Sequence, residues 1–306
     1  MRATAPLLGL LLAAAPLAAH VKHAKNSQAD QKVHKVEKLA DNVYCIFGNG
    51  GNIGLVVTEK YAVLIDDQFE NILPGLREAV KSVTDKPIKY LINTHHHGDH
   101  TGSNRGLESQ VVAIVAHANV RRHLLEDQKG KPADQQGGLP EITVGEEDGR
   151  VKARMDIHLG GVEMHLLHFK PGHTDGDIMV GLPHASVPVL HMGDLFFNGV
   201  IPFIDLKSGG SLAGMLENVE HVLGFVPENA RIIPGHGPVA TKKDLLRFRD
   251  FLKAVQAHVA AHPGMSGKEL DASFDHKAWA DVKPLGTFLA YPAFFDLAAG
   301  RIPQGR

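Results

Sequence analysis

Cysteine is almost absent from this 306-residue sequence, in which Cys45 is the single thiol. One cysteine cannot form an intrachain disulfide, and it excludes a metal site built from several thiolates. Any metal ion must therefore be held by histidine, aspartate or glutamate side chains. Cys45 alternates with Val43 and Phe47 in an apolar run, so we expect it to be a small buried hydrophobic residue.

An excess of positive charge is also lacking, because 32 lysine and arginine residues are balanced by 34 aspartate and glutamate residues. We therefore expect no nucleic-acid partner and no general attraction to anionic lipid. A content of 43% hydrophobic and 22% charged residues excludes a disordered or fibrous chain. Histidine is abundant, with 20 copies, which favours metal chemistry but also raises the frequency of chance histidine motifs.

An apolar run lies at the N-terminus, where Arg2 precedes the alanine- and leucine-rich stretch 7–17. Residues 1–19 are typical of a secretory signal peptide with cleavage near Ala19. A transmembrane anchor needs about 20 apolar residues, and this run is shorter and interrupted by proline and glycine. We expect a periplasmic or secreted protein with no stable membrane anchor, in which the polar residues 20–32 form a flexible leader.

Hydrophobic periodicity predicts alternating strands and helices along most of the chain. The expected strands are 33–39, 43–47, 53–58, 61–65, 88–92, 111–115 and 231–233, with a β-rich region at 142–192. The expected helices are 73–83, 117–126, 212–223 and 245–259. Antiparallel hairpins followed by strands interrupted by helices favour a layered α/β fold.

The chain divides into a main domain at 33–261 and a C-terminal extension at 262–306. Ser266 and Glu269 have the spacing of a capping box, which predicts a short helix in the extension. We expect the extension to pack on the main domain rather than to form a domain of its own. The sequence does not indicate an oligomeric state.

An apolar strand runs directly into the segment THHHGDHTG, residues 94–102. The alternation of His95 and His97 lets two imidazoles converge on one cation. Asp99 and His100 follow on the continuing turn and can face a second cation.

Three later segments add candidate ligands at strand ends. PGHTDGD places His173 in a glycine-flanked loop, HMGDLF places Asp194 at the end of an apolar strand, and PGHGP places His236 just after another strand. Such loops are favoured places for ligands because a rigid sheet positions them. His96 lies between two candidate ligands and is expected to point away from the metal ions.

The ordered set of candidate ligands resembles the metallo-β-lactamase superfamily over roughly residues 33–260. The resemblance implies an αββα four-layer sandwich with the site at one edge of two sheets. It implies that the first metal ion is held by His95, His97 and His173. It implies that the second is held by Asp99, His100 and His236, with Asp194 bridging the two. Asp66 matches an acidic position that orients metal ligands in this family, although a turn or cap role is equally compatible with the sequence.

Two cations close together lower the pKa of a shared water, so the expected nucleophile is a metal-bridging hydroxide rather than a side chain. Asp99 is the expected catalytic residue, because beside that water it can orient the attack and carry the proton. Two zinc ions per chain are the default for nitrogen and oxygen ligands, with iron and manganese as open alternatives.

Comparison with branches of the family narrows the substrate. β-Lactamases with a metal-binding cysteine carry that cysteine where this sequence has Asp194. A bridging aspartate at this position resembles the lactonase, thioesterase and phosphodiesterase branches, but lactonases of the quorum-quenching type carry a tyrosine shortly after it. Phe196, Phe197 and Asn198 follow here instead. Asn198 is expected either to donate to a developing oxyanion or to support a turn.

The apolar residues in this stretch either line one wall of a pocket or belong to the core: Phe196, Phe197, Ile201, Phe203 and Ile204. We predict an exported dinuclear zinc hydrolase that opens a small carbonyl substrate such as a lactone, a thioester or another ester or amide. A genuine metallo-β-lactamase that hydrolyses β-lactam antibiotics is the alternative enzyme. A non-catalytic periplasmic protein that binds metal or a partner is the alternative of another class.

Overall fold

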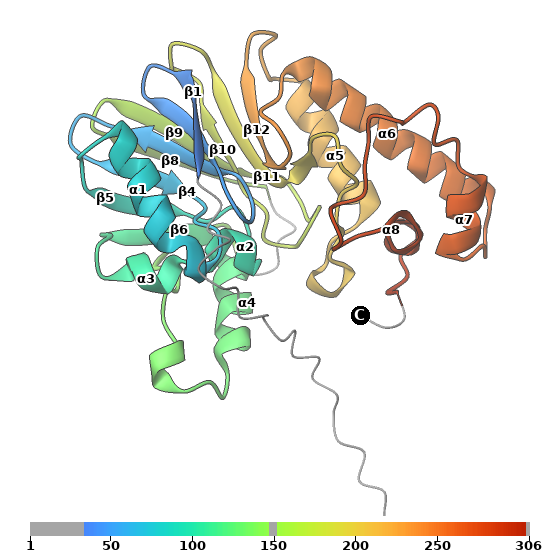
Figure 1. The fold of residues 1–306 in the computed structure, drawn as a ribbon, viewed down its shortest axis with the longest axis horizontal. Helices are drawn as coiled ribbons and strands as arrows, with labels where there is room; N and C mark the ends of the chain where they lie inside the picture. Colours follow the sequence, from blue (N-terminus) through green and yellow to red (C-terminus); the bar gives the residue numbers. More distant parts are fainter. Residues whose placement is uncertain (1–33, 147–151, 304–306) are drawn as a thin grey trace, which may run out of the picture.

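The computed structural model describes residues 34–146 and 152–303, which form two stacked β-sheets between two groups of helices (Figure 1). Helix α1 (Leu73–Val83) covers one sheet, while α5 (Leu212–Leu223) and α6 (Lys242–Ala261) cover the other. This order of helix, sheet, sheet and helix confirms the predicted αββα sandwich.

The first sheet has seven strands, which lie in sequence order. They are β1 (Lys35–Ala40), β2 (Val43–Phe47), β3 (Ile53–Val57), β4 (Ala62–Ile65), β5 (Ile88–Ile92), β6 (Ala113–His117) and β7 (Ile142–Val144). Strands β1 to β4 pair antiparallel, and β4 to β7 pair parallel.

The second sheet has the strand order β12-β11-β10-β9-β8. Its strands are β8 (Ala153–Leu159), β9 (Val162–His168), β10 (Met179–Leu182), β11 (Val189–Phe197) and β12 (Arg231–His236). Strands β11 and β12 are parallel, and the other neighbours are antiparallel. The remaining helices, with 3-10 turns marked η, are η2 (Glu70–Ile72), α2 (Gly98–Thr101), α3 (Asn104–Glu108), α4 (Ala118–Gln128), η3 (Ala133–Gln135), η4 (Leu206–Ser208), α7 (Gly267–Ser273) and α8 (Tyr291–Ala298).

Buried apolar side chains hold the layers together. Between the sheets, Val56 and Ile92 of the first sheet share a cluster with Leu166 of the second, and Cys45 lies buried in the same cluster, as predicted. On the outer face of the first sheet, Leu76 of α1 belongs to a second cluster. Each such buried aliphatic side chain stabilises the fold by about 1.5–3 kcal/mol relative to an exposed one.

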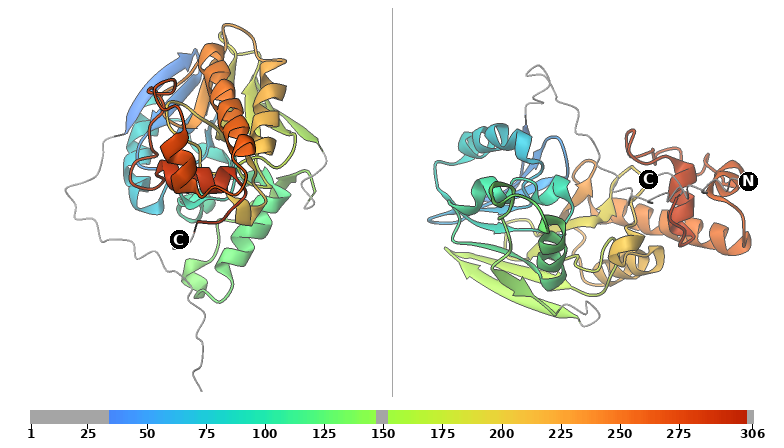
Figure 2. Two further views of the ribbon diagram at one scale, coloured as in Figure 1. Left: turned by 90° about the vertical axis from the view of Figure 1, so that its right-hand side faces the viewer. Right: turned by 90° about the horizontal axis from the view of Figure 1, so that it is seen from below.

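A third cluster joins the second sheet to α5, α6 and the chain after residue 262. Helix α7 begins with the predicted capping box between Ser266 and Glu269. Helix α8 buries Phe294, whose ring stacks on Phe251 of α6 with centroids 5.8 Å apart. Figure 2 shows α6, α7 and α8, coloured orange to red, at the end of the molecule away from α1. These contacts support the proposal that the C-terminal segment is an extension of the main domain.

Strand β6 begins two residues later than the sequence pattern predicts, at Ala113 instead of residue 111. The backbone N–H of Val111 donates to the carbonyl of Leu107 at the end of α3, and Val112 is 65% exposed. The apolar run therefore starts in a helix end and a solvent-facing position, and the strand starts where burial begins.

The expected signal peptide, residues 1–19, and the expected leader, residues 20–32, lie outside the described residues. In the two ranges that the structure describes, no helix combines the length and the apolar composition that crossing a bilayer requires.

Truncation of a buried ring in α8 should destabilise the protein more than truncation of an exposed one. We expect Phe294→Ala to lower the free energy of unfolding by about 3–5 kcal/mol, because it leaves a cavity against α6. Phe288→Ala, at a side chain that is 56% exposed, should cost about 1 kcal/mol or less. Denaturant unfolding of both variants measures the difference. Equal losses would contradict the close packing of α8.

Candidate metal centre

The seven predicted ligands come together at one edge of the two sheets. His95 and His97 follow β5, Asp99 and His100 lie in α2, His173 lies in the loop between β9 and β10, Asp194 lies in β11, and His236 ends β12. Strand β12 is longer than its predicted range of 231–233, because its pairing with β11 continues as far as Phe197 and His236. Since the ligands come from both sheets, the site forms only when the sheets stack.

Two glycines let Asp194 reach the centre of the site. Gly193 has a φ of +50°, and a side chain there would collide with Thr94. The register of β11 against β12 shifts on both sides of Gly193. A Cβ at Gly235 of β12 would collide with the carboxylate of Asp194. Glycine at position 193 therefore allows Thr94 to lie close to β11, and glycine at position 235 allows the carboxylate of Asp194 to lie close to β12.

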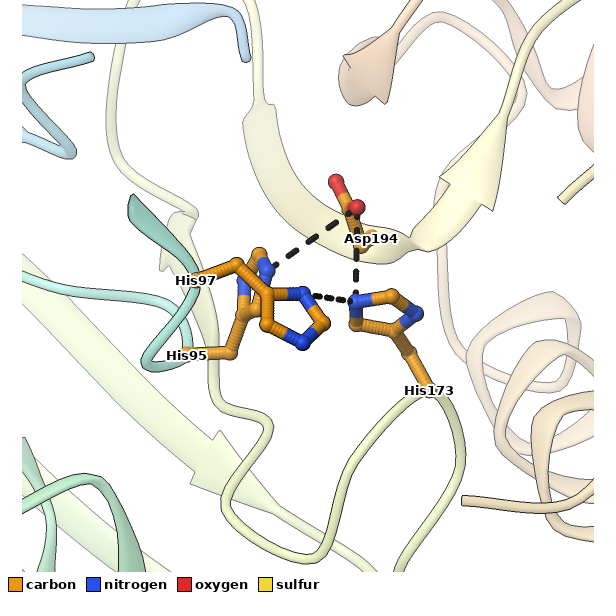
Figure 3. A group of neighbouring side chains, drawn as sticks. All are labelled: His95, His97, His173 and Asp194. Carbon is orange, nitrogen blue, oxygen red and sulfur yellow. Dashed lines mark hydrogen bonds and ion pairs between the residues drawn. The ribbon is translucent and has the colours of Figure 1, made fainter. Parts of the chain in front are cut away.

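The first group consists of His95, His97, His173 and Asp194, which point toward one another (Figure 3). One donor atom of each residue lies within 4.8 Å of all the others. Nε2 of His173 lies 3.0 Å from Nδ1 of His97 and 3.4 Å from Oδ2 of Asp194. Nε2 of His95 is buried and makes no hydrogen bond with any described residue. Nitrogen ligands of a tetrahedral zinc stand about 3.3 Å apart, so this donor set fits a cation.

The second group consists of Asp99, His100 and His236. Nε2 of His236 lies 3.3 Å from Oδ2 of Asp99 and 3.5 Å from Oδ2 of Asp194. The other oxygen of Asp194, Oδ1, lies 3.1 Å from Nε2 of His100. The carboxylate of Asp194 therefore contacts members of both groups, which is the position that a bridging ligand requires.

Asp66 holds His100 from outside the two groups. Oδ2 of Asp66 lies 2.7 Å from Nδ1 of His100 and accepts a hydrogen bond of 2.7 Å from the hydroxyl of Thr94. That hydroxyl also lies 3.1 Å from Nδ1 of His95. Asp66 has a φ of +65°, a conformation that is uncommon outside glycine and persists where the surroundings determine it. These contacts fix the ring orientation of two candidate ligands.

Two further carboxylates, which the sequence patterns did not reveal, hold candidate ligands of the first group. Oδ2 of Asp205 lies 3.0 Å from Nε2 of His97. The carboxylate of Asp177 accepts hydrogen bonds from the backbone N–H groups of His173 and Thr174. Asp177 lies in the same PGHTDGD segment, so its turn pattern was a usable signal. Asp205 is 108 positions away from its partner, and no local pattern connects them.

Burial and neighbouring charges act differently on the two groups. Burial lowers the pKa of His173 to about 4 and lowers that of His95 well below its usual value. Burial alone would lower the pKa of His100 as well, but the carboxylates of Asp194 and Asp99 raise it well above its usual value. Because an imidazole binds metal in its neutral form, His95 and His173 favour a cation directly, whereas a cation at His100 must displace a proton.

His96 and Asn198 belong to neither of these two groups. His96 is only 8% exposed and stacks on His123, with ring centroids 4.1 Å apart. The side-chain amide of Asn198 donates to the carbonyl of Pro238 over 3.0 Å, and it thereby holds the loop that follows β12.

Four of the five apolar residues considered for a pocket wall are buried in the third core cluster: Phe196, Phe197, Ile201 and Ile204. Phe203 is only partly buried, and its ring centroid lies 5.8 Å from that of His97 and 5.9 Å from that of His173. Core packing therefore accounts for Phe196, Ile201 and Ile204. Phe197 is buried too, but its ring stacks on His236 with centroids 5.2 Å apart, while Phe203 flanks the first group.

Comparison with known proteins agrees with this geometry. A family model described as "Metallo-beta-lactamase superfamily" matches residues 46–239, more than half of the chain. The "Probable metallo-hydrolase YqgX" of Bacillus subtilis (strain 168) is 26% identical over 201 residues, which cover 63% of this chain and 92% of that protein. The "Hydroxyacylglutathione hydrolase GloC" of Haemophilus influenzae is 28% identical over 199 residues, which cover 64% and 89%.

The fold has a counterpart among solved structures. The crystal structure of metallo-beta-lactamase IND-7 superposes with a TM-score of 0.59 at 19% identity, and the match covers 72% of this chain and 99% of that chain. At this identity the likeness concerns the fold, whereas the family match rests on the sequence. The chain therefore belongs to the metallo-β-lactamase superfamily and is a metal-dependent hydrolase.

Proposed function

We propose that this protein is an exported dinuclear zinc hydrolase that opens a small carbonyl substrate, such as a lactone, a thioester or another ester or amide. The observation that carries the proposal is the carboxylate of Asp194, which contacts imidazoles of both groups. The name of the Haemophilus relative denotes hydrolysis of an acyl compound, which supports a carbonyl substrate. Export rests on the sequence of residues 1–19 alone.

In this proposal the first cation is held by His95, His97 and His173, the second by Asp99, His100 and His236, and Asp194 lies between them. Imidazole and carboxylate donors suit zinc, and iron and manganese use the same ligand types. When bound, two such cations polarise a carbonyl oxygen and make water nucleophilic at neutral pH. The chain contributes the spacing of the donors and the orientation of the rings.

Asp99 is the proposed catalytic residue. Its side chain is 25% exposed, whereas that of Asp194 is 5% exposed, so Asp99 is the carboxylate that solvent and substrate can reach. Burial alone would raise the pKa of Asp99, but His100 and His236 hold it at about 2. The ionised carboxylate can orient an attacking water, accept its proton and pass the proton to the leaving group.

A hydrolase needs a metal site that small molecules can reach, whereas a structural metal site is closed by its protein ligands. A cavity of about 380 Å³ reaches His236 and is also lined by Phe47. Phe288, which is 56% exposed, contacts Phe203 with ring centroids 5.3 Å apart. Since Phe203 flanks the first group, these two rings favour a substrate with an apolar group next to its carbonyl.

Removal of the Asp99 carboxylate should impair turnover. We expect Asp99→Ala to lower kcat by about 10²–10⁴-fold, because proton transfer loses its carrier. Steady-state kinetics with parallel zinc analysis of the protein measure the effect. Asp85→Ala is the matched control, because Asp85 is an exposed carboxylate that precedes β5, at the strand end opposite to the site. Wild-type turnover by Asp99→Ala would refute the assigned role.

Metal removal should lower stability. Zinc at 100 times its Kd should raise the free energy of unfolding by about 2.7 kcal/mol relative to protein treated with a chelator. Thermal unfolding with and without zinc measures the shift, which His173→Ala should reduce. His165→Ala should keep the full shift, because His165 pairs with Glu163 outside the site. An identical unfolding temperature with zinc and with chelator would contradict a metal site.

The substrate class is tested by a parallel panel of an acyl lactone, a thioester, a β-lactam and a phosphodiester. We expect turnover of the lactone or the thioester and none of the phosphodiester. Phe288→Ala should raise KM about fivefold for long-chain acyl substrates, equivalent to a loss of about 1 kcal/mol of contact, and should leave short-chain substrates unchanged. Turnover of the β-lactam alone favours the β-lactamase alternative. No turnover by zinc-loaded protein contradicts a hydrolase of these substrates and favours the non-catalytic alternative.

A further inference from the structure

The segment 203–208 contacts two candidate ligands of the first group from outside. The backbone carbonyl of Phe203 lies 2.8 Å from Nδ1 of His173. Oδ2 of Asp205 lies 3.0 Å from Nε2 of His97. The backbone N–H of Asp205 also donates to the carbonyl of His173 over 3.0 Å, which ties the two loops together. One short segment therefore holds the outer nitrogens of two imidazoles.

The carboxylate of Asp205 is itself held in place. Its Oδ1 accepts hydrogen bonds of 3.0 and 3.2 Å from the backbone N–H groups of Lys207 and Ser208, and thereby caps η4. Its Oδ2 lies 2.7 Å from the hydroxyl of Ser208. The side chain is only 15% exposed. Both oxygens thus have fixed partners, and Oδ2 is the one that remains for His97.

This arrangement determines which ring nitrogen of each imidazole carries hydrogen. A carboxylate and a carbonyl only accept, so His97 donates from Nε2 and His173 donates from Nδ1. The inner nitrogens, Nδ1 of His97 and Nε2 of His173, are then unprotonated, and they lie 3.0 Å apart. Two facing lone pairs at this distance repel each other unless a cation binds them. The outer contacts therefore prepare the inner nitrogens for metal.

The segment is also tied to the C-terminal extension. The backbone N–H of Ile201 donates to the carbonyl of Lys283, and the N–H of Lys283 donates to the carbonyl of Gly199. These two bonds form an isolated bridge between the extension and the loop that leads into Asp205. The C-terminal extension is thus part of the support of the first group.

We propose that Asp205 is a positioning residue that selects the metal-binding tautomer of His97 and so sets the affinity of the first group for its cation. The proposal rests on the metal ligation assumed in the proposed function, but not on any substrate. A competing interpretation starts from His96, His97 and Asp205, which form a third group of possible ligands. If this group and the first group both held a metal ion, His97 would have to bind metal through both ring nitrogens. Asp205 would then be a ligand itself.

The substitution Asp205→Asn removes the charge of the side chain and changes the tautomer of His97, while the shape of the side chain stays the same. The cap of η4 needs an oxygen toward the two backbone N–H groups, so the NH₂ of the introduced amide must face Nε2 of His97. Two donors then face each other, and His97 shifts its hydrogen to Nδ1, where it blocks metal. The variant keeps the volume of the side chain and the cap.

Asp66 offers a comparison variant, because it holds His100 of the second group as Asp205 holds His97. Through the hydroxyl of Thr94 it also contacts His95 of the first group. Asparagine tolerates the positive φ of Asp66, so Asp66→Asn is compatible with the backbone. Asp175→Asn is the matched control. Asp175 pairs with Arg122 and His123, and its backbone N–H donates to the carbonyl of Ser208. Asp175→Asn therefore shows whether removing a carboxylate next to the segment 203–208 is enough to change zinc binding.

The experiment measures zinc affinity by competition with a chromophoric chelator in two backgrounds. His236→Ala leaves the first group, and His173→Ala leaves the second. We expect Asp205→Asn to weaken zinc binding about 10–100-fold in the His236→Ala background and to leave it within about twofold in the His173→Ala background. Asp66→Asn should weaken zinc binding in the His173→Ala background, and Asp175→Asn should change neither affinity. Metal-free Asp205→Asn should unfold at the temperature of the metal-free parent.

Unchanged affinity of Asp205→Asn in the His236→Ala background would overturn the proposal, as would an equal loss in Asp175→Asn. A second zinc ion in the His236→Ala background that disappears with Asp205→Asn would make Asp205 a ligand and overturn its positioning role. Because zinc binding is read without substrate, a protein that gives the expected affinities but hydrolyses no carbonyl compound contradicts only the proposed function.

Discussion

A buried carboxylate among imidazole nitrogens is the interaction on which this structure depends. Asp194 is 5% exposed and lies within 3.5 Å of nitrogens of His100, His173 and His236. A charge with so little access to water is stable only when it is paired, and here either a protonated imidazole such as His100 or a bound cation supplies the opposite charge. A side chain at Gly193 would collide with Thr94, and one at Gly235 would collide with the carboxylate of Asp194, so both positions next to this contact require glycine.

The rest of the fold positions Asp194 and the imidazoles around it. The stacked sheets bring strand ends from both halves of the chain to one edge, and the core between the sheets keeps them there. Around the donors, Asp66 and Asp205 and the carbonyl of Phe203 hold the outer ring nitrogens. Beyond these, the C-terminal segment braces the loop that contains Phe203 and Asp205 through the backbone of Lys283. The residues after 262 therefore pack on α5 and α6 and also contact the loop that leads into Asp205.

Local patterns predicted those features that depend on neighbours in the chain. The capping box at Ser266 and the buried Cys45 follow from spacing within a few residues. Strand β6 was misplaced by two residues because an apolar pattern does not distinguish a helix end from a strand. Asp205 was missed because its partner, His97, is far away along the chain. The sequence could not distinguish Phe203 from its buried neighbours, because only the folded structure places its ring next to His97.

The sequence by itself determined the layered α/β architecture and the residue types available for metal, since hydrophobic periodicity and clustered histidines are properties of contiguous segments. Only the tertiary structure decided that Asp194 touches both groups, that Asp66 and Asp205 hold different ligands, and that Phe197 and Phe203 of the apolar stretch flank the site. Each of these facts is a distance between residues from different strands or loops. Such distances arise when the two sheets stack, and no spacing along the chain encodes them.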